Sequence, residues 1–169
     1  GLFPKPESTI GKITDHLIII GYGVTGKNVA RAAKYGNIPH VIIEMNPDTV
    51  RKELDKGEII HFGDAAQTEV LEHANIEEAI TLVVTVPYSS DTKRIVSLAR
   101  KLNPHVHIIV RTRFLNDMKS LHDLGADEII PEEFETSVEI FTRVLAKYLV
   151  PRNEIEELVS KIRDDEYEM

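Results

Sequence analysis

The sequence predicts an α/β fold with a doubly wound sheet of six parallel strands, followed by a C-terminal helical extension. Short apolar runs alternate with amphipathic stretches from residue 16 to about residue 130. The runs are near-continuous in Val, Ile and Leu, as in strands buried on both faces of a sheet with helices on each side. The first run ends in a glycine-rich turn that opens a helical stretch.

Six strands and five intervening helices follow from these patterns. The predicted strands are His16–Ile20, His40–Glu44, Glu58–Phe62, Ile80–Val86, His107–Arg111 and Glu128–Ile130. The predicted helices are Thr25–Tyr35, Pro47–Asp55, Gln67–His73, Ser90–Leu102 and Leu115–Leu124. Two strand-helix series that meet beside the first strand give a Rossmann-like order, whose ligand crevice lies at the carboxyl ends of the strands.

The turn after the first strand reads Gly-Tyr-Gly-Val-Thr-Gly over residues 21–26. Gly21 permits the tight turn, Gly23 lets the backbone approach a phosphate, and Gly26 allows the helix to pack closely on the sheet. The free N–H groups of the helix start then face the anion. Glu44 ends the second strand, where it can accept from both ribose hydroxyls and repels a 2′-phosphate, which favours NAD or a simple adenine nucleotide over NADP. Taken alone, such a motif can also be only a strand-to-helix turn.

The third and fourth strands end in residues that suit the same crevice. Gly63 lets the chain pass close to an adenine, and Asp64 can accept from an amino or hydroxyl group. A Gly-Asp pair on its own is usually just a turn. Pro87 lacks an N–H and halts the fourth strand beneath the ligand.

Arg111 ends the fifth strand, where its planar, bidentate guanidinium would lie near a phosphate or a carboxylate. A lone Arg at a strand end is more often a surface ion pair, and in this crevice we favour the ligand role. Glu132 and Glu133 follow the sixth strand. They could hold a cation, pair with Arg111, or form a solvated acidic helix start.

After Pro131 the pattern changes to a helical extension. Phe134–Val150 reads as a long helix with a broad apolar stripe, and a second helix starts at Asn153 and runs to Ile162 before an acidic tail. Helices beyond a finished sheet predict either a dimer made by this extension, which we favour, or an ordinary last layer. The predicted organisation is a linker from an upstream membrane segment (1–15), a nucleotide-binding domain (16–133) and a dimerisation extension (134–169).

Composition narrows the function classes. The chain has 169 residues, 42% of them hydrophobic and 28% charged, as in an ordinary globular protein. A net charge of −8 argues against a nucleic-acid partner. Cysteine is absent, which excludes disulfides, thiolate metal sites and a cysteine nucleophile. No signal peptide or membrane-spanning run is visible, but the chain starts at Gly1 rather than Met, so a membrane segment could precede it.

Catalytic groups are scarce. None of the seven histidines falls in a metal-ligand pattern, and no Ser-x-x-x-Lys or Tyr-x-x-x-Lys pair or Gly-x-Ser-x-Gly elbow is present. No substrate domain follows to complete a dehydrogenase site. We therefore predict nucleotide binding without catalysis: no enzyme, no catalytic residues and no metal site.

Six segments together resemble a known family and are far more specific as a set than the first of them. They read Ile-Ile-Ile-Gly-Tyr-Gly-Val-Thr-Gly (18–26), Val-Ile-Ile-Glu-Met-Asn (41–46), Gly-Asp-Ala (63–65), Leu-Val-Val-Thr-Val-Pro (82–87), Ile-Ile-Val-Arg (108–111) and Gly-Ala-Asp-Glu-Ile-Ile-Pro-Glu (125–132). The set is similar to the regulator of potassium conductance domains, also called TrkA amino-terminal domains, over about residues 16–150. The stretch from Leu2 into the first strand is similar to the joint of Kef-type monovalent cation:proton antiporters.

The resemblance implies a domain at the cytoplasmic face of the cell membrane that senses an adenine nucleotide, AMP or NAD(H), and controls a potassium channel or potassium/proton antiporter. It also implies a homodimer through residues 134–165, possibly within a larger ring, and a membrane cation transporter as partner. The cofactor-binding residues predicted from the motifs and the resemblance are Gly21, Tyr22, Gly23, Val24, Thr25, Gly26, Glu44, Met45, Asn46, Gly63, Asp64, Ala65, Val86, Pro87 and Arg111.

Two departures from the family pattern limit the ligand. Many relatives carry Arg and Phe where Val24 and Thr25 stand, which puts ATP in doubt, and Arg111 and Arg113 stand where calcium-gated relatives place acids. The alternatives are a fragment of a small NAD-dependent oxidoreductase and a structural dimerisation module with a vestigial crevice.

Overall fold

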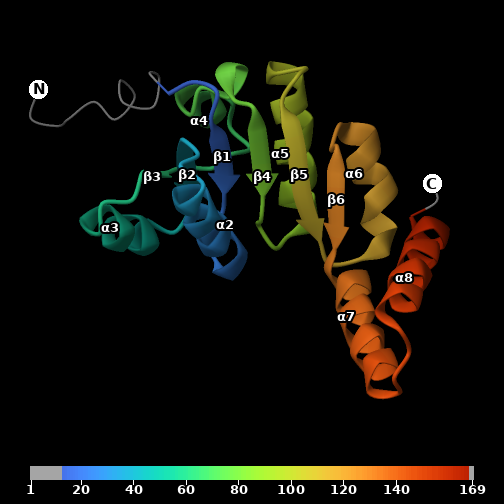
Figure 1. Ribbon diagram of the computed structural model, residues 1–169. Helices are drawn as coiled ribbons and strands as arrows, with labels where there is room; N and C mark the ends of the chain where they lie inside the picture. The colour runs from blue at the N-terminus through green and yellow to red at the C-terminus, as the bar shows by residue number, and fades with distance from the viewer. Residues whose placement is uncertain (1–12, 168–169) are drawn as a thin grey trace, which may run out of the picture.

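The computed structural model describes residues 13–167, which form one six-stranded sheet with helices on both faces and a helical hairpin at one edge (Figure 1). The strands are β1 (Leu17–Ile20), β2 (His40–Glu44), β3 (Ile60–Phe62), β4 (Thr81–Val84), β5 (His107–Thr112) and β6 (Glu128–Pro131). The helices are α2 (Val24–Tyr35), α3 (Pro47–Asp55), α4 (Thr68–His73), α5 (Ser89–Leu102), α6 (Met118–Leu124), α7 (Glu132–Lys147) and α8 (Arg152–Glu166), with 3₁₀ turns at Ile76–Glu78 and Leu115–Asp117.

The strand order is β3-β2-β1-β4-β5-β6, and every neighbouring pair is parallel. This confirms the predicted doubly wound, Rossmann-like order with β1 at its centre. Because all strands run the same way, their carboxyl ends meet along one edge of the sheet. That edge gathers the glycine-rich turn and the strand-end residues that the sequence singled out.

Two hydrophobic cores cover the two faces of the sheet. The side chains of β1 alternate between the two cores. Ile18 and Ile20 point to the face covered by α4, α5 and α6, whereas Leu17 and Ile19 point to the face covered by α2 and α3. All four of these side chains are buried, as are those of β2 up to Ile43. The prediction of strands buried on both faces is therefore confirmed for β1 and β2.

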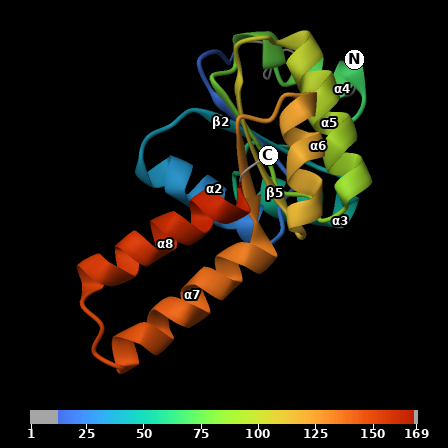
Figure 2. The ribbon, with the colours of Figure 1, turned by 90° about the vertical axis from the view of Figure 1, so that its right-hand side faces the viewer.

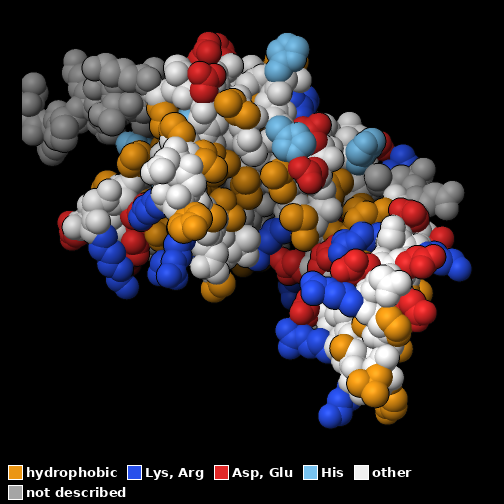
Figure 3. All heavy atoms as spheres, viewed as in Figure 1, with side chains coloured by type: hydrophobic (Ala, Val, Ile, Leu, Met, Phe, Trp, Pro, Cys, Tyr) orange, Lys and Arg blue, Asp and Glu red, His pale blue; other side chains and the backbone are white. Residues whose placement is uncertain are grey.

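The other half of the sheet differs from that prediction. Burial alternates along β4, β5 and β6, because α5 and α6 cover one face while the opposite face has no helix of its own among the described residues. Val83, Ile109 and Ile130 lie on this face and remain partly or largely exposed. We call these three side chains the open face. In the view of Figure 3, apolar side chains gather over this half of the sheet.

Helices α7 and α8 form a hairpin that projects away from the sheet, on the side opposite α5 and α6 (Figure 2). Only Phe134 and Val138 of α7 are buried. Near its base the hairpin is closed by Glu135, which accepts hydrogen bonds from Arg163 (3.0 Å to Nη2) and from the Tyr167 hydroxyl (2.7 Å). The hairpin is thus not the ordinary last layer that the sequence left as an alternative.

Predicted helix boundaries near this hairpin were wrong. Helix α7 begins at Glu132, directly after Pro131, rather than at Phe134. Helix α8 continues to Glu166, through part of the predicted acidic tail, because Arg163 and Tyr167 hold it to α7. The predicted linker 1–15 lies outside the described residues except for residues 13–15. Between residues 13 and 167, no helix combines the length and the apolar character needed to cross a membrane.

His16 lies buried at the amino end of β1, where its Nε2 contacts the carbonyl oxygen of Ala74 at 2.7 Å. Its Nδ1 has no hydrogen-bond partner in the described part of the chain. Burial lowers the pKa of His16, and burial followed by the charge of His73 lowers the pKa of His61. Both imidazoles are therefore neutral in the folded protein at neutral pH.

We predict that acid destabilises the fold through these histidines. Because their pKa values are lower in the folded chain than the unfolded value of about 6.5, the unfolded chain binds more protons, and stability falls as pH drops through that value. The free energy of unfolding is measured by urea titration at pH 7 and at pH 5. Its loss between the two pH values should be smaller in His16→Gln than in wild type, by on the order of 1 kcal/mol. The same difference in a His105→Gln control, at an exposed position, would contradict the assignment.

Candidate functional site

The turn between β1 and α2 is built from glycines that the packing requires at two positions. Gly21 has a φ of +99°, and a Cβ there would lie 2.6 Å from Oγ1 of Thr85. At Gly26 a Cβ would lie 1.9 Å from the carbonyl oxygen of Gly21, so only glycine lets α2 start this close to the strand. The hydroxyl of Thr85 supports the turn by donating to the carbonyl of Ile20 at 2.8 Å.

Gly23 differs from its neighbours because nothing in the protein demands a glycine there. It is the N-cap of α2 at a φ of −77°, and a Cβ would meet no atom within 4 Å. The backbone N–H groups that follow it lie at the start of a 12-residue helix, where the partial positive charge of the helix is concentrated. The space in front of Gly23 therefore suits the close approach of an external anionic group.

Glu44 is fixed beside this turn by two backbone donors. The N–H of Tyr22 donates to Oε1 at 2.8 Å, and the N–H of Asn46 donates to Oε2 at 2.7 Å. Each carboxylate oxygen retains a free lone pair, since a carboxylate offers about four acceptor positions. The side chain is partly exposed, so it can accept further hydrogen bonds from a diol at the mouth of the site.

A crevice of about 510 Å³ opens at the carboxyl edge of the sheet beside these groups. Eleven of the predicted residues line it: Gly21, Tyr22, Gly23, Glu44, Met45, Gly63, Asp64, Ala65, Val86, Pro87 and Arg111. The loop after β3 is held in shape by Asp64, whose Oδ1 accepts from the N–H of Ala66 at 2.9 Å. The predicted strand-end residues thus come together from β1, β2, β3, β4 and β5.

Four predicted residues do not line the crevice. Val24 is largely exposed on the first turn of α2, and Gly26 lies buried beneath that turn. Asn46 is the N-cap of α3, where its Oδ1 accepts from the N–H groups of Asp48 (2.9 Å) and Thr49 (3.3 Å), so helix capping accounts for this residue. Thr25 touches the crevice only through Arg111.

Sequence reasoning missed part of the crevice wall. Thr85 lies under the first turn, while Tyr88, Asp91 and Ile95 belong to the start of α5. Thr85 could have been found from its position at the end of β4, next to Pro87. The three α5 residues gave no signal, because their part in the wall depends on how α5 packs on the sheet.

Arg111 connects the crevice to two helices. Its Nη1 donates to Oγ1 of Thr25 at 3.2 Å and forms an ion pair with Glu132, 3.1 Å from Oε1. Its Nε is buried and has no hydrogen-bond partner within residues 13–167. The side chain is 29% exposed. Arg111 therefore keeps donors for a further acceptor. Of the alternatives that the sequence left open for Glu132, the structure shows the pairing with Arg111.

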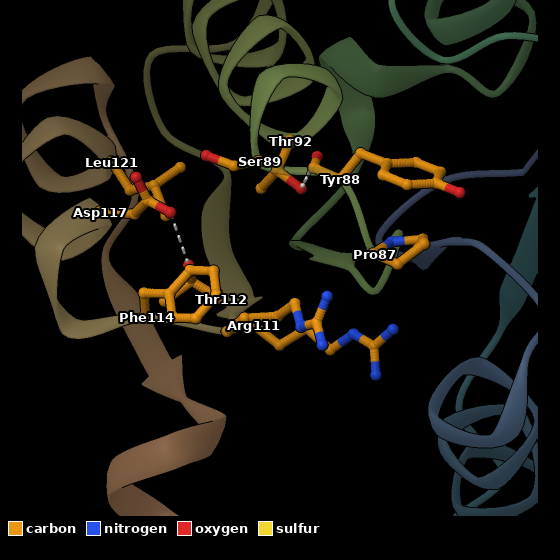
Figure 4. Close-up of a pocket in the computed structure, with 10 residues that line it drawn as sticks. Pro87, Tyr88, Ser89, Thr92, Arg111, Thr112, Phe114, Asp117 and Leu121 are labelled. Carbon is orange, nitrogen blue, oxygen red and sulfur yellow. Dashed lines mark hydrogen bonds between the residues drawn. The ribbon is translucent and has the colours of Figure 1, made fainter.

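A smaller hollow of about 190 Å³ lies on the other side of Arg111, between the start of α5 and the 3₁₀ turn before α6 (Figure 4). On its floor, Asp117 contacts Lys93 at 3.1 Å and the hydroxyl of Thr112 at 3.4 Å. Burial raises the pKa of Asp117, but hydrogen bonds from Lys93 and Ser89 and the Lys93 charge outweigh it and leave the pKa below its ordinary value. Asp117 is thus an ionised structural partner of Lys93.

The described residues contain no group of three or more His, Asp or Glu side chains that could hold a metal ion. The crevice wall contains no His, Lys or Ser. What it offers is a set of backbone donors at the α2 start, a guanidinium, a fixed carboxylate and apolar side chains that include Met45, Val86 and Pro87. Such a set can bind an anionic ligand that carries a diol and a flat ring.

Comparison with known proteins identifies relatives of this site. Residues 17–132 match the TrkA-N domain family. Probable potassium channel protein 2 of Methanocaldococcus jannaschii is 33% identical over 129 residues, which cover 75% of this chain and 38% of that protein. The putative cation/proton antiporter YbaL of Escherichia coli is 29% identical over 123 residues, which cover 73% of this chain and 22% of that protein. The chain therefore spans well under half the length of these relatives.

Solved structures agree with the sequence match. The TrkA-N domain of YbaL has a TM-score of 0.75 at 27% identity, covering 78% of this chain and 97% of that one. The Kef CTD of Shewanella denitrificans, described in an AMP bound form, has a TM-score of 0.77 at 23% identity and covers 90% of this chain and 92% of that one. At that identity the second likeness bears on the fold alone. The family predicted from the sequence motifs is thus confirmed.

Two of the three glycines in the turn, Gly23 and Gly26, lead to a stability prediction. Gly26→Ala should lower the free energy of unfolding by about 3 kcal/mol or more, because the added methyl overlaps the Gly21 carbonyl and α2 must shift. Gly23→Ala should change it by less than about 1 kcal/mol, because its Cβ enters open space. Equilibrium urea unfolding of both variants measures the contrast, and equal losses would show that the turn is not packed as described.

Proposed function

The chain belongs to the TrkA-N domain family, and on that basis we propose that it is a regulatory domain that senses an adenine nucleotide, AMP or NAD(H), and controls a potassium channel or a potassium/proton antiporter. One observation carries the proposal. Glu44, fixed by two backbone N–H groups, stands beside the open helix start at Gly23, so a diol acceptor and an anion site lie side by side.

In the proposed complex the phosphate lies against the start of α2 in front of Gly23, within reach of Arg111. The ribose hydroxyls donate to Glu44, whose charge disfavours a 2′-phosphate. The adenine lies against the apolar part of the crevice wall beside Met45, where Asp64 accepts from its amino group. Val86 and Pro87 form the floor beneath it.

The exposed apolar side chains of the hairpin support a homodimer through residues 134–165. Ile140 and Val144 of α7 are 59% and 50% exposed, and Tyr148 and Leu149 at the tip are exposed further. Apolar side chains gather at this tip in Figure 3. A hairpin this apolar, on the opposite side of the sheet from α5 and α6, is suited to cover the open face of a second copy. In a two-fold dimer each copy would do so for the other, and such dimers could assemble into a ring.

The proposed regulation acts at the cytoplasmic face of the cell membrane, on a membrane cation transporter of the same or an associated chain. Residues 16–133 would bind the nucleotide, residues 134–169 would form the dimer, and residues 1–15 would join the domain to a membrane segment. A ligand shifts the geometry of the dimer only if it binds one geometry better, typically by about 1–3 kcal/mol. The relatives support such a partner, since they are named as a probable potassium channel protein and a putative cation/proton antiporter.

Nucleotide binding is tested by calorimetric titration of AMP, NADH and NADPH. We expect AMP and NADH to bind and NADPH to bind more weakly. Glu44→Gln should weaken AMP binding about tenfold, because it removes the charge and one acceptor. It should also reduce the difference in affinity between NADH and NADPH. Asp48→Asn, an exposed acid at the next helix start, is the matched control. Oxidation of NADH with simple carbonyl compounds would instead favour the oxidoreductase alternative, and no binding at all would leave a vestigial crevice.

The dimer is tested by sedimentation equilibrium. Ile140→Glu places a charge in the exposed apolar stripe of α7, so the dimer dissociation constant should rise at least tenfold while the circular dichroism spectrum stays that of a folded chain. Asn153→Glu adds the same carboxylate at an exposed polar position of α8 and should leave the dimer intact. A wild-type chain that stays monomeric, or equal effects of both variants, would contradict the proposed interface.

A further inference from the structure

Arg111 is held between the nucleotide crevice and the hairpin. One nitrogen, Nη1, donates a hydrogen bond to Thr25, on the turn proposed to bind phosphate, and forms an ion pair with Glu132, the first residue of α7. The distances are 3.2 Å to Oγ1 of Thr25 and 3.1 Å to Oε1 of Glu132. The contact with Thr25 shows that this guanidinium reaches the first turn of α2.

Glu132 therefore stands where it opposes a phosphate. It pairs with the guanidinium of Arg111, which a phosphate bound at the first turn of α2 would also engage. It also brings a negative charge close to the negative charge of such a ligand, and like charges in a partly buried crevice repel. The side chain of Glu132 is 41% exposed and has no other ion-pair partner among residues 13–167, so it can move away without losing a second bond.

Glu132 also links Arg111 to the base of the hairpin. This residue begins α7, and one turn further on Glu135 holds α8 through Arg163 and Tyr167. The path from the crevice to the closed base of the hairpin is thus Arg111, Glu132 and one helical turn. Side chains three residues apart lie on neighbouring positions of a helix surface.

We propose that Glu132 is a built-in competitor of the nucleotide phosphate for Arg111, and that this exchange couples the crevice to the dimerisation hairpin. Binding of a phosphate-bearing nucleotide transfers Arg111 from Glu132 to the phosphate and frees the first turn of α7. By linkage, a dimer geometry that pulls Glu132 away from Arg111 raises the affinity for nucleotide by the same factor. This inference rests on the proposed nucleotide-sensing function.

The first test compares AMP with adenosine, which lacks the phosphate, by calorimetric titration. In Glu132→Gln the affinity for AMP should rise about two- to fivefold, the range expected for a partly exposed ion pair, while the affinity for adenosine stays unchanged. Glu133→Gln removes the same charge from the next residue, which is exposed and does not contact Arg111. Its AMP affinity should rise by clearly less.

The second test asks whether the gain acts through Arg111. Arg111→Gln should weaken AMP binding, and adding Glu132→Gln to it should raise AMP affinity by clearly less than the same change does in wild type, because only the charge repulsion is then relieved. Hydrogen exchange adds a readout on the hairpin: AMP should speed amide exchange in the first two turns of α7 in wild type. In Glu132→Gln that exchange should be fast already without AMP.

Several outcomes overturn the inference. Equal AMP affinity in Glu132→Gln and wild type, an equal gain in Glu133→Gln, or a gain for adenosine would each do so while the nucleotide-sensing function stands. A full gain from Glu132→Gln in the Arg111→Gln background would show that the effect bypasses Arg111. Failure of wild type to bind AMP, NADH and NADPH alike would reject the proposed function and this inference together.

Discussion

The rest of the site depends on the close contact between the start of α2 and the end of β1. The position of a Cβ at Gly26 lies within 2 Å of the Gly21 carbonyl oxygen, which fixes where the helix begins relative to the strand. That contact sets the free N–H groups of α2 at the carboxyl edge of the sheet. It also brings the N–H of Tyr22 within 2.8 Å of Glu44, so the anion site and the carboxylate are positioned by one turn. The anion site and the diol acceptor are therefore consequences of one packing constraint.

The sequence predicted the two-sided burial of β1 and β2 because continuous apolar runs are typical of strands buried on both faces. It predicted the strand order because strands alternate with helices in two series that meet beside the first strand. It did not predict the open face, because Val83, Ile109 and Ile130 are equally apolar whether a helix of the chain covers them fully or leaves them partly exposed. The direction of the hairpin was also beyond the sequence. It depends on Leu149, whose φ of +62° turns the chain back after α7, and on the bonds of Glu135 to α8.

The site could be predicted where a residue lies at or shortly after the carboxyl end of a strand, as Gly63, Asp64, Pro87 and Arg111 do. It could not be predicted where a side chain enters through helix packing, as Tyr88, Asp91 and Ile95 do at the start of α5. Asn46 caps α3 and does not line the crevice, and a motif match does not separate a ligand residue from a helix cap. Local sequence thus indicates which residues stand at the crevice edge, and only packing determines which of them face it.

The charges around the crevice bear on how a sensor of this kind releases its ligand. Among the lining residues that the structure describes, Glu44, Asp64 and Asp91 are acidic and Arg111 is the single base. An anionic ligand therefore depends on backbone donors of α2 and on one guanidinium that is already bonded to Glu132. The backbone donors can hold a phosphate whatever the position of the hairpin. The guanidinium of Arg111, in contrast, also pairs with Glu132 at the start of the hairpin. The part of the binding energy that varies with hairpin position is therefore concentrated in Arg111, and a difference of this kind is what regulation requires.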